Sequence, residues 1–246
     1  MSLLLLLLVS FPFACFALEP PAVPVLGNVQ SAAPPPLLDS PVYSMATLCD
    51  SGKDKIEDEN DTNDARPKTT NMNVVTYATP VSVAPDRIWA LGLYKETLSY
   101  ADFCLRRSCI LQLLSKEHTP LIRILGGTSG RDVEKQEECQ RLGFAWHRLP
   151  PGSTEEDGDY PPMPLVLPGC VKYLRLKAVG DLRDMGSHAV ALCRVEETWG
   201  VPQDDPSEGE EPREQPHLST ARLRELGIIT AQGRVADQSA QVKRDD

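Results

Sequence analysis

The sequence lacks the motifs of the most common catalytic sites. It contains no GxSxG elbow, no HExxH and no Walker A motif, and its four histidines show no metal-ligand spacing. These absences argue against serine hydrolases, zinc metalloproteases and P-loop nucleotidases. If the protein is an enzyme, a cofactor is therefore expected to do the chemistry, while the side chains bind and orient it.

A concentrated positive charge is also missing. The chain has 246 residues and a formal net charge of −10, and two acidic tracts at 50–64 and 204–214 contribute −5 each. The remainder is close to neutral, so the tracts are interpreted as solvated linkers or loops. Nucleic-acid binding needs a basic face, and this absence excludes it.

Cysteine pairs with CxxC spacing are absent, so we expect no structural zinc site. Of the seven cysteines, Cys15 lies in the N-terminal leader, which leaves six. An even number permits disulfides in an oxidising compartment. Cys170 and Cys193 lie in apolar, strand-like runs, and Cys104 and Cys109 flank a helix-to-strand corner. We therefore expect buried thiols and leave the disulfide state open.

Long apolar runs are missing beyond the N-terminus. The first residues, MSLLLLLLVSFPFACFA, end in Cys15-Phe16-Ala17 and are interrupted by Pro12. This pattern predicts a signal peptide at 1–17, cleaved after Ala17, in preference to a membrane anchor. No stable membrane span is expected after cleavage. The leader predicts entry into the secretory pathway, with a secreted or lumenal destination, or a plastid if the leader is bipartite.

The composition divides the rest of the chain. Residues 18–69 are rich in proline and alanine and then acidic, which predicts a disordered linker. Ordered sequence is expected from about Asn71, in a domain at 70–200. An acidic loop at 201–216 and a C-terminal helix and tail at 217–246 follow.

Short apolar runs in this domain predict several strands and few helices. Strands are expected at 73–85, 87–94, 108–114, 164–170, 171–183 and 188–197. A helix is expected at 98–107, with Ser99 as its cap and Asp102 completing a capping box. Two helical pieces are expected at 119–143 around a glycine break. This arrangement predicts a mainly β, α+β fold, an antiparallel β-barrel with short peripheral helices.

Two polar segments are candidates for a binding site. Asn73, Thr76, Thr79 and Ser82 recur every third residue along one strand, which implies a bend or bulge near Pro80 if they share a face. The simpler interpretation is that threonine is a good strand former.

The second segment is the strand-to-helix corner of GLYKETLSYADF. Lys95, Thr97 and Ser99 offer an ammonium group and two hydroxyls beside the unpaired N–H groups of a starting helix. Such a combination suits a phosphate. Read alone, the corner is more typical of a capped surface helix with a solvated lysine.

Taken together, these segments resemble the flavin reductase-like proteins of the FMN-binding split-barrel class. The resemblance covers about 71–195 and LSTARLRELGII, and it rests on NVVTYATPVS, on the Lys95 corner, on SGRDVEK and on LPGCVKYLRLK. It implies a split β-barrel, a homodimer and one FMN per subunit near the interface.

The resemblance also implies roles for individual residues. Lys95, Thr97 and Ser99 would hold the FMN phosphate, while the flavin ring and ribityl chain would lie along Asn73, Thr76, Tyr77, Ala78, Thr79 and Ser82. Many family members carry Gly-Asp-His near a late strand, where this chain has Gly186-Ser187-His188. His188 is the one catalytic candidate, with a positional role or none.

The implied function is hydride transfer from NAD(P)H to the flavin. Two alternatives stay open from the sequence. The protein could bind FMN or carry electrons without turning over nicotinamide, or it could be a split barrel that has lost flavin and binds another small molecule.

Overall fold

The computed structural model describes residues 38–50, 68–150, 162–200 and 217–236. All of them belong to the unit Leu37–Asp246. The predicted leader, the two acidic tracts for the most part, and the C-terminal tail lie outside the described residues.

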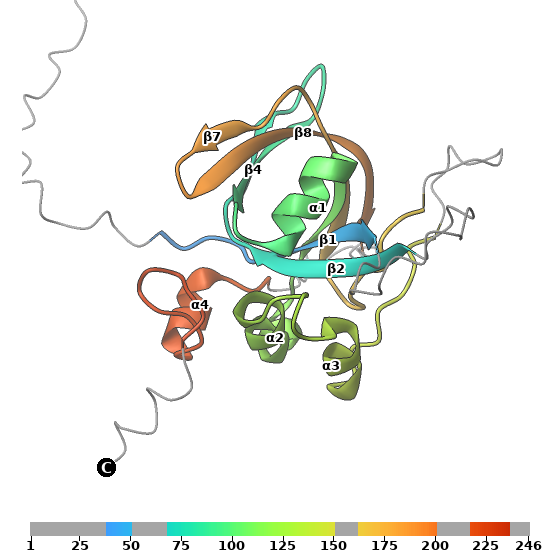
Figure 1. Ribbon diagram of the computed structural model, residues 1–246. Helices are drawn as coiled ribbons and strands as arrows, with labels where there is room; N and C mark the ends of the chain where they lie inside the picture. The colour runs from blue at the N-terminus through green and yellow to red at the C-terminus, as the bar shows by residue number, and fades with distance from the viewer. Residues whose placement is uncertain (1–37, 51–67, 151–161, 201–216, 237–246) are drawn as a thin grey trace, which may run out of the picture. The chain divides into compact units, whose positions relative to one another are not determined.

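The described residues form one antiparallel sheet. Its order is β2-β1-β5-β6-β8-β4-β3, and a short strand, β7, pairs with β8. This confirms the predicted mainly β, antiparallel fold with few short helices (Figure 1). The strands are β1 Tyr43–Asp50, β2 Lys68–Val75, β3 Ala78–Ser82, β4 Ile88–Tyr94, β5 Ser108–Leu113, β6 Lys172–Ala178, β7 Arg183–Met185 and β8 His188–Gly200.

The two ends of the sheet order are neighbours along the chain. Strands β2 and β3 pair with different partners, β1 and β4, and only Thr76 and Tyr77 separate them. Because the same stretch supplies both edges, the sheet curls round into a split barrel. The sequence predicted a single strand here. The predicted irregularity near Pro80 is confirmed, since the register with β4 shifts between Pro80 and Ser82.

Successive side chains of a strand point to opposite sides of the sheet, and they fill two separate hydrophobic cores. In β6, the neighbouring residues Tyr173 and Leu174 point to opposite sides of the sheet, and both are buried. Tyr173 belongs to the outer core, beneath the peripheral helices, and Leu174 belongs to the barrel core. The barrel core consists of Tyr43, Met45, Val75, Leu91, Leu93, Phe103, Cys109, Leu111, Leu174, Leu176, Ala191 and Cys193.

The helices lie in two places. Helix α1, Leu98–Arg106, packs against β1, β2 and β5 and buries Phe103 completely in the barrel core. Helices α2 Ile122–Gly127, α3 Lys135–Arg141 and α4 Thr220–Glu225 lie on the other side of β1 and β2 (Figure 1), with a 3₁₀ helix at Lys116–Leu121. The two helical pieces predicted at 119–143 are thereby confirmed.

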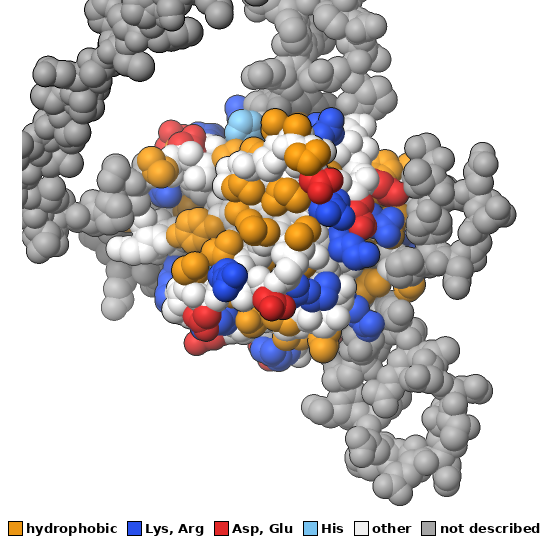
Figure 2. Space-filling view, turned by 90° about the horizontal axis from the view of Figure 1, so that it is seen from above, with side chains coloured by type: hydrophobic (Ala, Val, Ile, Leu, Met, Phe, Trp, Pro, Cys, Tyr) orange, Lys and Arg blue, Asp and Glu red, His pale blue; other side chains and the backbone are white. Residues whose placement is uncertain are grey.

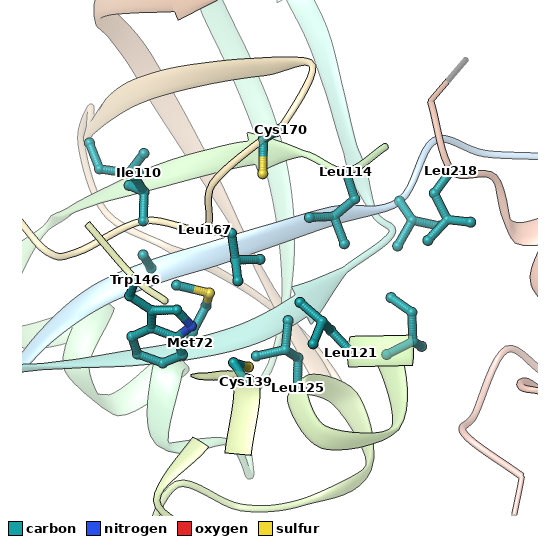
Figure 3. Close-up of a cluster of buried hydrophobic side chains, with 14 of the residues drawn as sticks. Met72, Ile110, Leu114, Leu121, Leu125, Cys139, Trp146, Leu167, Cys170 and Leu218 are labelled. Atoms are coloured by element: carbon teal, nitrogen blue, oxygen red, sulfur yellow. The ribbon is translucent and has the colours of Figure 1, made fainter. Parts of the chain in front are cut away.

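The outer core joins segments that are distant in sequence. Figure 3 shows Met72 of β2 near Trp146, and Leu218 near Leu114, within one cluster of buried side chains. The backbone N–H of Val42 donates to the Leu218 carbonyl at 2.9 Å, which ties both ends of the described chain to the sheet. The C-terminal helix therefore belongs to the same unit as the predicted 70–200 domain.

Two predictions about strands were wrong. Tyr43–Asp50 forms β1, although it lies within the predicted linker at 18–69. Its buried positions include Ser44, Ala46 and Thr47, which give little apolar periodicity, and the strand is held by distant partners in β2 and β5. The predicted strand at 164–170 is reduced to one bridge between Val166 and His147.

Phe103 provides a test of how α1 is held. Phe103→Ala removes a fully buried ring from the barrel core and should lower the free energy of unfolding by about 3–5 kcal/mol. Leu105 lies on the same helix and is 74% exposed, so Leu105→Ala should change it by less than about 0.5 kcal/mol. Urea denaturation measures both. Equal effects of the two substitutions would contradict the placement of α1.

Candidate functional site

The corner between β4 and α1 is closed by Thr97. Its hydroxyl donates to the Tyr94 carbonyl at 2.9 Å and accepts from the Tyr100 backbone N–H at 3.2 Å. Thr97 is therefore the N-cap of α1, and the predicted cap at Ser99 was wrong. The hydroxyl of Thr97 or of Ser99 could cap a helix that starts here. Ser99 instead bonds to Asn71, so Thr97 is the cap.

Ser99 points into the protein. It is 2% exposed, and its hydroxyl accepts a hydrogen bond from the Asn71 side-chain amide at 3.0 Å. The same amide donates to the Asp102 carboxylate at 3.0 Å, and the Thr47 hydroxyl donates to that carboxylate at 3.3 Å. We call Thr47, Asn71, Ser99 and Asp102 the polar anchor, because they fasten α1 to β1 and β2.

Lys95 is the cation of the corner. Its ammonium group donates to Asp184 Oδ2 at 2.9 Å, and its backbone N–H donates to the Ser187 carbonyl at 3.1 Å. The other carboxylate oxygen of Asp184 accepts from the Gly186 N–H at 2.9 Å. The hydrogen bond from Lys95 holds the pKa of Asp184 below its ordinary value. The β7–β8 turn is thus bound to the corner.

Three aromatic rings cluster at the start of β8. His188 is the first residue of β8 and lies opposite Tyr94 of β4. Its ring centre is 5.3 Å from that of Tyr94 and 5.5 Å from that of Tyr77. His188 Nδ1 is 2.9 Å from the Ser187 hydroxyl. Tyr77 is 63% exposed, so the ring cluster of Tyr77, Tyr94 and His188 reaches the surface.

The remaining predicted residues are spread over two edges of the sheet. Asn73 belongs to β2 and pairs with Met45 of β1, whereas Thr79 belongs to β3 and pairs with Ala90 of β4. Asn73 Oδ1 accepts from the Val74 N–H at 2.9 Å. The Ser82 hydroxyl donates to the Ala84 carbonyl at 3.3 Å.

The two residues left from the predicted set flank the split in the barrel. Thr76 is half-buried between β2 and β3, and Ala78 packs against the barrel core. From the predicted set, the structure therefore brings the rings of Tyr77 and His188 together, and it joins Lys95 to Ser187, the residue before His188, by a backbone hydrogen bond. The ligand contacts of all these residues stay predictions.

Sequence reasoning missed Tyr94 and Asp184. The motif at 186–188 has no acid, but the fold places the Asp184 carboxylate against Lys95, 89 positions away in sequence. The turn Asp184-Met185-Gly186, with Gly186 at φ 75°, was the available local signal. It could not have identified Lys95 as the partner.

A second histidine lies buried near a thiol. His118 is fully buried, and its Nε2 is 2.8 Å from the Pro168 carbonyl and 3.9 Å from Cys170 Sγ. Burial raises the pKa of Cys170 to about 12, so the thiol stays protonated at neutral pH. This pair is a buried structural contact and not a nucleophilic site.

The described residues include six free cysteines. Cys109, Cys139, Cys170 and Cys193 are buried, as predicted, whereas Cys104 is exposed. Within the described ranges, no helix is long and apolar enough to cross a membrane. The same ranges contain no group of three or more His, Cys, Asp or Glu placed to hold a metal ion.

Solved structures of flavin proteins have a similar fold. An FMN-binding protein from Thermus thermophilus, with bound p-hydroxybenzaldehyde, is 15% identical, covering 82% of this chain and 89% of its own, with a TM-score of 0.49. A flavoredoxin from Methanosarcina acetivorans is 12% identical, covering 67% of this chain and 70% of its own, with a TM-score of 0.47.

A third similar structure is an NADH:FAD oxidoreductase from Streptomyces globisporus, in complex with NAD and FAD fragments. It is 13% identical, covering 67% of this chain and 77% of its own, with a TM-score of 0.46. No protein-family model and no curated protein matches the sequence.

Proposed function

We propose that the protein binds FMN at the β4–α1 corner and that the bound flavin accepts a hydride from NADH or NADPH. The observation that carries this proposal is the surface ring cluster, in which Tyr94 directly precedes Lys95 and His188 directly follows Ser187, whose carbonyl accepts from the Lys95 backbone N–H. A planar ring system with an anionic tail matches that arrangement of rings and cation.

The corner fits a phosphate through Lys95 and the start of the helix. An ammonium group carries three N–H donors, and Asp184 takes one of them. The positive end of the α1 dipole adds to the attraction for an anion. The Thr97 hydroxyl already caps the helix and Ser99 is buried, so Lys95 has the largest role in this proposal.

Asp184 competes with a phosphate for the same ammonium group. Its side chain is 73% exposed, compared with 31% for Lys95. An exposed ion pair contributes little free energy, so a phosphate with two negative charges can replace the carboxylate at small cost.

The ring cluster would position the flavin. Bound flavin supplies the hydride-accepting chemistry, which the side chains do not provide. Tyr77 and His188 would contact the ring system, and Thr76 and Thr79 would offer hydroxyls from either side of the barrel split. His188 would orient the nicotinamide without forming a covalent bond.

A homodimer is part of the proposal. Exposed apolar side chains gather on one face, which Figure 2 shows from above. Leu192 of β8 is 46% exposed and lies opposite Ala90, and Met185 of β7 is 61% exposed and lies opposite His188. Contiguous apolar surface of this kind marks interaction sites. A second copy on this face would cover the ring cluster and shield the flavin from water.

Sedimentation equilibrium tests the dimer. We expect twice the mass of one chain for the wild type and one chain mass for Leu192→Glu, because a buried unpaired carboxylate opposes association. Leu142 is 48% exposed and follows α3, away from this face, so Leu142→Glu should stay dimeric. A monomeric wild type would contradict the proposal.

An anaerobic titration tests the function. The purified protein should bind FMN with a change in its visible spectrum, and NADH or NADPH should then bleach the flavin absorbance. Binding without bleaching would favour the alternative of a non-catalytic flavin or electron-carrier protein. Failure to bind FMN would contradict both flavin functions.

A further inference from the structure

A separate cavity lies at the end of the barrel opposite α1. It has a volume of about 150 Å³ and is lined by Tyr43, Arg87, Trp89, Leu113, Lys172, Leu174, Val195 and Thr198. Strand β4 begins at this end and β5 finishes there, whereas the Lys95 corner follows the far end of β4. The cavity is therefore distinct from the proposed flavin site.

The walls of the cavity are apolar and aromatic. Leu174 and Val195 belong to the packing of the barrel core, and the rings of Tyr43 and Trp89 meet edge to face at 5.9 Å. Burial raises the pKa of Tyr43, so its hydroxyl stays protonated and can donate. Such walls suit a ring that carries one polar group.

The polar lining is cationic. Arg87 and Lys172 both line the cavity and are exposed, and neither has an ion-pair partner among the described residues. The neighbouring acids are engaged elsewhere. Asp86 pairs with Arg194 at 3.2 Å, and Glu196 pairs with Arg175 at 3.3 Å. The two uncompensated cations attract an anion to the mouth of the cavity.

We propose that this cavity binds a small carboxylate with a single aromatic ring. A cavity of about 150 Å³ holds one benzene-sized molecule, and a three-ring flavin is too large for it. The ring would lie against Trp89 and Leu174. The carboxylate would accept hydrogen bonds from Arg87 and Lys172, since guanidinium and carboxylate groups match in geometry.

Benzoate is the probe for this proposal. We expect saturable shifts of the Trp89 indole signal in ¹H–¹⁵N spectra of the full chain, assigned by its loss in Trp89→Phe. The indole signals of Trp146 and Trp199, which contact the outer core, should not move. Benzyl alcohol has the same ring without the charge and should bind roughly tenfold more weakly.

Two variants locate the carboxylate. Arg87→Gln and Lys172→Gln should each weaken benzoate binding by roughly tenfold, because each loses a charge-assisted hydrogen bond. Lys177 is an exposed lysine on the same strand as Lys172 but pairs with Glu196, so Lys177→Gln is the matched control and should bind as the wild type does.

Several results would overturn the proposal. They are an unmoved Trp89 signal, equal binding of benzoate and benzyl alcohol, or unchanged affinity in the Arg87→Gln, Lys172→Gln double variant. Benzoate should also bind equally to Lys95→Ala, so this test is independent of the flavin proposal. Loss of benzoate binding in Lys95→Ala would show that benzoate binds at the Lys95 corner and not in this cavity, and would overturn the proposal.

Discussion

The hydrogen bonds from the Asn71 amide to Ser99 and Asp102 hold the candidate site in place. Asp102 is 6% exposed, and a buried carboxylate is costly unless it is hydrogen-bonded. Asn71 and Thr47 supply donors from β2 and β1. Because these bonds fix the first turn of α1, they also fix Thr97 and the Lys95 corner that precedes it. The polar anchor thus connects the buried side of α1, which carries Phe103, to the surface corner that carries Lys95 and Thr97.

The split in the barrel depends on a glycine. The Gly92 N–H donates to the Tyr77 carbonyl at 2.7 Å, and a Cβ at Gly92 would come within 2.9 Å of the Tyr77 Cβ. A side chain there would push away the segment that joins β2 to β3. Because Gly92 has no side chain, Tyr77 can lie close to β4, and its ring then contacts His188. The same close approach of Tyr77 to Gly92 therefore shapes the split in the barrel and places a ring of the cluster.

Local patterns predicted much of this fold. The alternation in β6 and β8 and the apolar run of β4 report burial directly, so these strands were placed correctly. Strand β1 could not be found in this way, because its small and polar buried residues depend on pairing with β2 and β5. The candidate site was less predictable than the fold. The sequence pointed to Lys95, Tyr77 and His188. The contact of Tyr77 with His188 and the bond from Lys95 to Ser187 depend on non-local pairing of β4 with β8, which no spacing rule within one segment can reveal.

We propose that Lys95 binds the phosphate of FMN. The most direct measurement compares dissociation constants for FMN and for riboflavin, which lacks the phosphate, in the wild type, Lys95→Ala and Asp184→Asn. Lys95→Ala should weaken FMN binding by roughly tenfold or more and leave riboflavin binding unaffected, because only FMN carries the phosphate. Asp184→Asn should tighten FMN binding, since it removes the competing carboxylate. Equal FMN affinity in the wild type and Lys95→Ala would rule out a phosphate-binding role for Lys95.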